Sequence, residues 1–141
     1  MGSAVRYDEV EVGTELPEQT FALERLTLIQ YAGASGDFNP IHWNERFATS
    51  VGLPDVIAHG MLTMAEAVRV VTDWVGDPGA VVEYGVRFTR PVVVPDEGGG
   101  RLTVSGVVTD KRDADQVVVT LTARSGAEKV LAQARAVVRL G

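Results

Sequence analysis

Hydrophobic positions in the middle of the chain follow a helical period. The segment 60–75, GMLTMAEAVRVVTDWV, is apolar around most of a helical circumference, and its charged positions are Glu66, Arg69 and Asp73. Their spacing of i, i+3 and i+7 places them in one stripe, where opposite charges can pair. We therefore predict one long helix that ends at Gly76 and is covered by other structure on most of its sides.

Beyond this helix the pattern changes to a period of two, which is typical of half-buried strands. Segments that alternate in this way or are rich in β-branched residues predict strands at 82–88, 102–108, 117–124 and 130–138. The segments between them have the composition of loops and hairpin connections, at 95–100, 109–116 and 125–129. Such short connections favour an antiparallel sheet. The expected fold class is α+β, with a curved antiparallel β-sheet wrapped around the long central helix.

The residues before the long helix give weaker patterns. A short first strand is predicted at 20–23. The sequence TLIQ has the capping-box form S/T-x-x-Q, which predicts a short helix from Thr27 to Gly33 or Gly36. A further helical turn is expected at 44–49.

Composition limits the classes of function. A chain of 141 residues with 45% hydrophobic content fits one domain, which we assign to residues 1–141. The absence of cysteine excludes disulfides and cysteine nucleophiles. A net charge of -6 argues against a nucleic-acid surface, because phosphate binding requires clustered Lys and Arg. The sequence contains neither an apolar run of membrane-spanning length nor the pattern of a signal peptide, so we expect a cytoplasmic protein.

Both histidines of the chain lie shortly before or at the start of the long helix, and one follows an aspartate. Asp37 and His42 are five residues apart, which is about 140° around a helix axis. On a strand the same odd separation sends the two side chains to opposite faces. They can therefore meet only across irregular backbone, which the Asn-Pro dipeptide between them and the nearby Gly33 and Gly36 supply.

These residues by themselves leave other interpretations open. Asp37 can cap a turn, and His42 can be an ordinary interior histidine. His59, a single histidine before an apolar helix, is expected to be structural. A metal site is not expected, because the 17-residue separation of the two histidines matches no compact ligand pattern.

Gly60 opens the predicted long helix. Its N–H is expected to be one of the unpaired donors of the first turn, at the positive end of the helix dipole and without a Cβ to keep a substrate away. These properties predict an anion site, and an ordinary glycine near a helix start is the simpler alternative. The following apolar residues, Met61, Leu62 and Met64, fit either an acyl tunnel or plain core.

The sequence SGDFNPIHWN, followed by AHGMLTM, resembles the hydratase/dehydratase motif of MaoC-like hot-dog enzymes. The segment 73–95 is also similar to the B-type catalytic subunit of actinobacterial (3R)-hydroxyacyl-ACP dehydratases. The resemblance implies a hot-dog fold, with Asp37 and His42 as the catalytic dyad and the N–H of Gly60 in an oxyanion hole. Asn39 and Pro40 are then supporting residues, and neither a cofactor nor a metal is expected.

The implied function is a (3R)-hydroxyacyl-thioester dehydratase, or an enoyl hydratase in the reverse direction. The implied substrates are acyl chains linked to acyl carrier protein (ACP) in type II fatty-acid elongation. The nearest alternative is a CoA-linked (R)-specific enoyl-CoA hydratase. A second alternative is a non-catalytic hot-dog module that binds acyl-CoA, but the intact Asp-x4-His spacing argues against it. A third alternative is a thioesterase on the same fold.

The resemblance also implies a side-by-side dimer. The expected substrate is an acyl-ACP or acyl-CoA thioester. The expected protein partner is a second hot-dog chain, which is identical in a homodimer or related in a heterodimer. Neither nucleic acid nor a membrane is an expected partner. Acyl carrier protein is acidic and this chain is net negative. Docking would therefore need a basic patch on the partner chain or from residues such as Arg87, Arg90 and Arg135.

Overall fold

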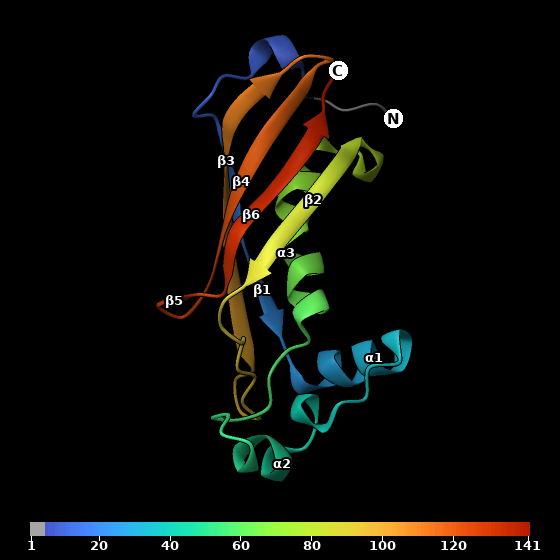
Figure 1. The fold of residues 1–141 in the computed structure, drawn as a ribbon, viewed down its shortest axis with the longest axis vertical. Coiled ribbons are helices and arrows are strands. Elements are labelled where there is room, and N and C mark those ends of the chain that lie inside the picture. Colours follow the sequence, from blue (N-terminus) through green and yellow to red (C-terminus); the bar gives the residue numbers. More distant parts are fainter. Residues whose placement is uncertain (1–4) are drawn as a thin grey trace.

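A long helix, α3, lies along one face of an antiparallel sheet in the computed structural model, which describes residues 5–141 (Figure 1). The sheet has the strand order β1-β3-β4-β6-β2, and the short β5 pairs with β4. The strands are β1 Glu15–Leu23, β2 Val81–Phe88, β3 Gly100–Arg112, β4 Gln116–Ser125, β5 Glu128–Lys129 and β6 Leu131–Arg139. The helices are α1 Arg25–Ser35, α2 Glu45–Ser50 and α3 Gly60–Val75, with 3-10 turns η1 Tyr7–Glu9, η2 Pro40–His42 and η3 Pro78–Ala80. This arrangement is the hot-dog fold that the resemblance implied.

The helix α3 begins and ends where the sequence predicted. Gly76 closes it in the left-handed conformation, with φ of 74°, and donates its N–H to Thr72 O. The inward face packs mainly against β1 and β3 through buried apolar residues, among them Leu62, Ala67, Val70, Val71 and Val75. The rest of the predicted cover is absent from this single chain, because the sheet curves around one side of the helix and leaves Met61 60% exposed.

The charged stripe of α3 forms only part of the predicted pairing. Arg69 lies 3.0 Å from Glu66, one turn earlier. Asp73 instead accepts a hydrogen bond from Gln19 of β1, at 2.9 Å. The stripe therefore joins the outer surface of the helix to the edge of the sheet.

All four predicted strands form, but their ends differ from the prediction. The strand predicted at 102–108 extends to Arg112, where it pairs with Gln116, so the hairpin turn is confined to 113–115. The polar residues at 109–112 therefore belong to the ladder, because cross-strand hydrogen bonds hold them there. The weak strand predicted at 20–23 is also longer and begins at Glu15.

The first helix, α1, corrects two details of the prediction. It begins at Arg25 rather than Thr27, and its N-cap makes no side-chain hydrogen bond, so the predicted capping box does not form. Gly33 lies inside the helix, whereas Gly36 ends it with φ of 79°. The predicted turn at 44–49 is the helix α2, whose first turn is capped by Asn44 Oδ1.

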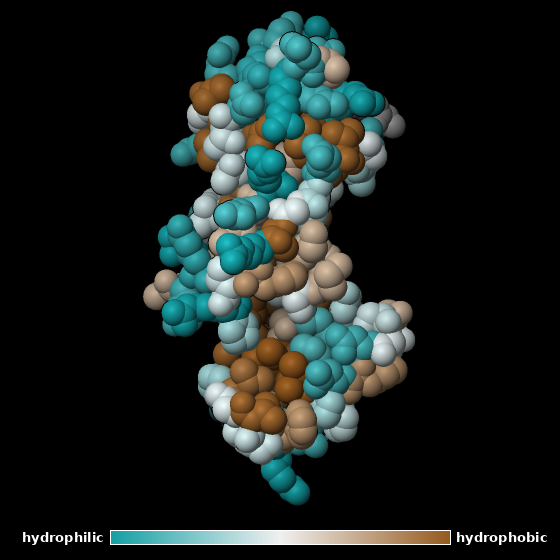
Figure 2. Space-filling view, viewed as in Figure 1, coloured by the Kyte–Doolittle hydropathy of each residue, from teal (hydrophilic) through white to brown (hydrophobic). Residues whose placement is uncertain are grey.

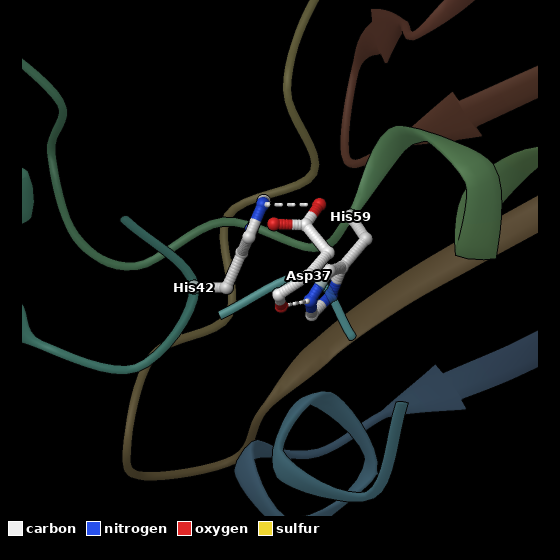
Figure 3. A group of neighbouring side chains, drawn as sticks. All are labelled: Asp37, His42 and His59. Carbon is white, nitrogen blue, oxygen red and sulfur yellow. Dashed lines mark hydrogen bonds and ion pairs between the residues drawn. The ribbon is translucent and has the colours of Figure 1, made fainter. Parts of the chain in front are cut away.

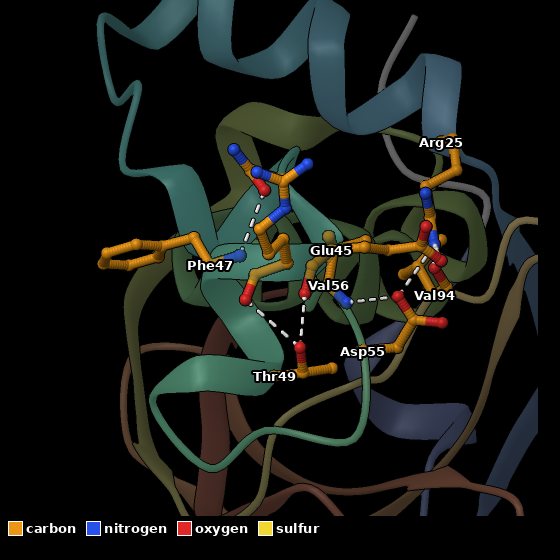
Figure 4. Close-up of polar contacts among 9 residues, drawn as sticks. Arg25, Glu45, Phe47, Thr49, Asp55, Val56 and Val94 are labelled. Atoms are coloured by element: carbon orange, nitrogen blue, oxygen red, sulfur yellow. Dashed lines mark hydrogen bonds and ion pairs between the residues drawn. The ribbon is translucent and has the colours of Figure 1, made fainter.

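Arg25 holds the first turn of α1 against the rest of the molecule (Figure 4). Its Nε–H donates to Val94 O at 2.6 Å, and its terminal nitrogen lies 2.8 Å from Asp55 and 3.1 Å from Glu45 of α2. These contacts explain why α1 starts two residues earlier than the local pattern indicated. They also join α1, α2 and the 92–94 segment, which together surround the loop that contains Asp37.

No helix within residues 5–141 is both long and apolar enough to cross a membrane.

Candidate active site

The backbone between α1 and η2 is irregular, as the spacing of Asp37 and His42 required. After Gly36, the carboxylate of Asp37 accepts the N–H of Asn39 at Oδ1, at 3.2 Å. The side chain of Asn39 in turn accepts the N–H of Ile41, and Pro40 opens the 3-10 turn that ends at His42. Two consecutive side-chain turns therefore shape the loop, and Asn39 and Pro40 lie where a supporting role would place them.

Two hydrogen bonds with Ile57 fix the position of His42. Ile57 donates its N–H to Ile41 O at 3.1 Å, and Ile57 O lies 2.6 Å from His42 Nδ1. The same segment pairs with 92–94 on its other side, through the Ile57–Val93 bridge. Because a carbonyl oxygen can only accept, Nδ1 carries the proton in this contact, and the lone pair of a neutral ring lies on Nε2.

The structure brings Asp37 and His42 together. Asp37 Oδ2 lies 3.8 Å from His42 Nε2 (Figure 3). This separation is too long for a direct hydrogen bond, but two atoms so placed can each lie about 2.8 Å from one shared water or hydroxyl oxygen. The His42 side chain is 7% exposed, whereas that of Asp37 is 51% exposed. Solvent therefore reaches the carboxylate of Asp37 in the single chain.

A pocket of about 410 Å³ lies beside His42. Its walls are mostly apolar, and its lining residues include His42 and Gly60 together with Ile41, Ile57, Val92 and Val130. The predicted acyl-lining residues are not part of this lining. Leu62 is core, and Met61 is mainly exposed.

Gly60 is the first residue of α3, so its N–H has no acceptor within the helix. A Cβ at this position would lie 3.3 Å from the ring of Phe88, which also lines the pocket. Gly60 therefore offers a backbone donor in a space that a larger residue would narrow. This geometry agrees with the predicted anion site, whose function remains a prediction.

His59 is more closely involved in the site than the sequence indicated. It is 1% exposed, its ring stacks on His42 with centroids 3.8 Å apart, and its Nε2 lies 3.1 Å from Asp37 O. Burial lowers the pKa of His59 below its ordinary value, which favours the neutral ring.

Asp37, His42 and His59 each offer a possible metal-ligand atom, and these atoms lie within 4.8 Å of one another. The two imidazole planes are only 19° apart, however, so their in-plane lone pairs run side by side rather than converge on one ion. The Nε2 of His59 is also occupied by its contact with Asp37 O. The arrangement fits a pair of stacked rings better than a metal centre.

Two residues of the site have no signal in the sequence. Thr63 is a buried polar residue one turn after Gly60, and it lines the same pocket. Phe88, at the end of β2, lies against Gly60 and is 50% exposed. Thr63 is part of an apolar helical pattern and Phe88 of a strand pattern, so only the folded structure places them beside His42.

Comparison with known proteins gives consistent results. Residues 9–127 match the family model described as MaoC like domain. A 3-hydroxyacyl-thioester dehydratase X from Mycobacterium tuberculosis is 43% identical over 70 residues, which are 50% of this chain and 24% of that protein. An (R)-specific enoyl-CoA hydratase from Rhodospirillum rubrum is 36% identical over 83 residues, which are 58% of each protein.

A solved structure of a MaoC-like dehydratase has a TM-score of 0.96 and 40% sequence identity, and the match covers 99% of this chain and 43% of that chain. The chain spans less than two thirds of the length of the two curated relatives, at 24% and 58%. The family model nevertheless matches far more than half of the chain. With the helix, the sheet and the site arranged as described, the protein belongs to the MaoC-like domain family.

Proposed function

We propose that the protein is a (3R)-hydroxyacyl-thioester dehydratase, which acts as an enoyl hydratase in the reverse direction, and that Asp37 and His42 are its catalytic dyad. The observation that carries this proposal is the 3.8 Å separation of Asp37 Oδ2 and His42 Nε2 beside a pocket that Gly60 also lines. The two curated relatives, a thioester dehydratase and an enoyl-CoA hydratase, support the reaction class.

Dehydration requires two proton transfers, and the site offers two groups for them. One member of the dyad takes the proton from C2, while the C3–O bond breaks and its electron pair leaves with the oxygen. The other member protonates that oxygen, so that water departs. In the reverse direction a water held between Asp37 and His42 adds to C3 of the enoyl thioester. The geometry allows either residue to fill either role, and we assign the pair jointly.

The N–H of Gly60 is the proposed stabiliser of the charge that develops in this reaction. Loss of the C2 proton places negative charge on the thioester oxygen, which needs a donor at that position. One oxyanion donor is typically worth about 2.7–4 kcal/mol. Because Gly60 and His42 line one pocket, a thioester there can reach the donor and His42 together.

The proposed substrate is an acyl chain linked to ACP in type II fatty-acid elongation, and an acyl-CoA is the alternative. Arg90 supports an acidic carrier because it lines the pocket, although its guanidinium lies 3.7 Å from Glu128. Arg87 and Arg135 are exposed on the neighbouring strands β2 and β6. Exposed arginines on these strands would meet an acidic carrier or the phosphates of CoA.

We further propose that the working unit is a dimer with a second hot-dog chain. Figure 2 shows hydrophobic residues gathered on the lower part of one face, beside α1, and again higher up near β2. Exposed apolar side chains on α3 and β2 include Met61, Val82 and Phe88. A partner that covered this side would also shield the half-exposed carboxylate of Asp37 from solvent.

The test is a direct comparison of carriers. The purified protein is mixed with crotonyl-ACP and with crotonyl-CoA, hydration is followed by loss of enoyl-thioester absorbance, and the product is resolved by chiral chromatography. We expect (3R)-3-hydroxybutyryl thioester from both, with a higher kcat/KM for the ACP substrate. A higher value for CoA would favour the alternative carrier. No turnover of either by the folded protein, alone or with a related hot-dog partner, would contradict the proposed reaction.

A further inference from the structure

One buried titratable group near the dyad has no part in the proposed chemistry. His59 contacts both members of the dyad: its ring face lies 3.8 Å from that of His42, and its Nε2 lies 3.1 Å from Asp37 O. The edge of the same ring meets Tyr31 of α1, with centroids 4.7 Å apart and planes at 60° (Figure 3 shows the two histidines with Asp37). One imidazole therefore connects the helix α1, the Asp37 loop and the His42 turn.

The contact with Asp37 fixes the tautomer of His59. A carbonyl oxygen accepts only, so Nε2 carries the proton. In the neutral ring Nδ1 is then a bare lone pair, and it is buried without a hydrogen-bond partner within residues 5–141. Protonation would turn Nδ1 into a buried, charged donor with no acceptor. The free-energy cost of burying such a donor is higher than that of burying the neutral, unpaired acceptor.

Burial outweighs the opposing groups that face His59 and favours the neutral form. Burial lowers its pKa, and the adjacent His42 acts in the same direction, whereas the carbonyl and the carboxylate of Asp37 oppose it. Tyr31 contributes an uncharged aromatic contact from α1. Two imidazolium rings at this distance would repel each other. A neutral His59 avoids this repulsion and can therefore stay stacked on His42 even when His42 is protonated.

We infer that His59 is the positioning residue of the site, which holds the His42 ring by its face and the Asp37 loop by its N–H. This inference rests on the proposed function. The His42 ring donates a hydrogen bond from Nδ1 to Ile57 O and stacks with one face on His59. These two contacts fix the direction of its Nε2 toward Asp37 Oδ2. Displacements of about 1 Å in such a pair cost on the order of a hundredfold in rate. His59 touches neither the transferred protons nor the substrate.

Three substitutions separate the two contacts. His59→Phe keeps a ring face against His42 but removes the N–H, His59→Gln keeps an N–H near Asp37 O but removes the face, and His59→Ala removes both. We expect His59→Ala to lower kcat for enoyl-thioester hydration at least tenfold while KM changes less than threefold. The Phe and Gln variants are each expected to retain more activity than the Ala variant. Tyr31→Leu, which removes only the outer support of the ring, is the matched control for packing.

A readout that does not depend on activity is the tautomer of His42, measured from ¹⁵N chemical shifts of the imidazole nitrogens. We expect one Nδ1–H form in the native protein and in His59→Phe, and a mixture of tautomers in His59→Gln and His59→Ala. If the native protein hydrates no enoyl thioester, the proposed function fails and this measurement alone decides the inference. A single Nδ1–H form in all folded variants, or a kcat within threefold of the native value in folded His59→Ala, would overturn it. Should the Ala variant not fold, the Gln variant provides the same tautomer comparison, and a single Nδ1–H form in it would overturn the inference.

Discussion

At the residue scale, Gly60 determines how closely a thioester can approach the start of α3. Replacement by Val adds a branched side chain where even a Cβ would lie 3.3 Å from the Phe88 ring. We expect Gly60→Val to lower kcat/KM for enoyl-thioester hydration at least tenfold, because substrate is held away from the N–H. The melting temperature should fall by only a few degrees, and Gly60→Ala should be intermediate in activity. A fully active Gly60→Val enzyme would show that the oxyanion donor lies elsewhere.

His59 also gives the protein a predictable response to acid. Its pKa in the folded state is lowered by burial below the ordinary value of 6.5. At higher pH both folded and unfolded chains hold it neutral. As pH falls through and below about 6.5, the unfolded chain binds a proton that the folded chain resists, so stability is lost. The melting temperature of the native protein should therefore fall more steeply in this range than that of His59→Gln. Parallel curves for the two proteins would refute the neutral buried ring.

The sequence pointed to the residues of the candidate site whose evidence is local and missed those that only the fold brings there. Asp37 and His42 could be paired through the family resemblance of the contiguous motif that contains them. Gly60 could be placed because a glycine opened a strong helical pattern. The stacking of His59 could not be predicted, since it depends on how the loop after α1 returns over the start of α3. Phe88 reaches Gly60 only through the pairing of distant strands.

At the scale of elements, the best prediction was the helix with signals at both ends. The apolar period and Gly76 gave α3 its correct bounds, because a left-handed glycine ends a helix by local geometry. The start of α1 was predicted wrongly, since Arg25 is held by tertiary contacts rather than by the capping box. Strand ends were equally poorly defined, because polar residues at 109–112 are kept in the ladder by their partners in β4.

The Arg25 contacts lead to a prediction about how α1 and α2 hold the Asp37 loop. Arg25→Met keeps the bulk of the side chain but leaves Val94 O without its donor and Asp55 without its cationic partner. We expect a loss of about 1–2 kcal/mol, which corresponds to a fall in Tm of about 3–8 °C. Hydrogen exchange should become faster at residues 37–42. Arg46→Met, on the outer side of α2, is the control and should change neither quantity; equal effects of both would contradict the assigned network.

At the scale of the whole molecule, the open sides of the fold predict association. The strand β2 is an edge of the sheet, with Val82 40% exposed, and α3 presents Met61 on an uncovered flank. Such an edge is most simply covered by a second copy of the fold. We expect a homodimer when the protein is purified alone and a heterodimer with a related hot-dog chain when the two are co-expressed.

Light scattering at micromolar concentration tests this association. Val82→Asp on β2 should shift the purified protein toward the monomer and lower its activity, because a charge is placed in the pairing edge. Ala22→Asp on β1, the opposite edge, is the control and should leave the dimer intact. A stable, fully active monomer would remove the need for a partner, whereas dissociation by the β1 variant alone would move the interface to the other edge.

The central claim is that Asp37 and His42 together carry out the proton transfers, and single-residue variants test it most directly. Turnover of crotonyl thioester is measured for Asp37→Asn, His42→Ala, the double variant and Asp96→Asn, a control for carboxylate replacement in an exposed loop. Each variant is first shown to be folded by circular dichroism. We expect each dyad variant to lose at least about a hundredfold in kcat, the double variant to be little worse than the poorer single one, and the control to match the native protein. Near-native turnover in either folded single variant would contradict the account.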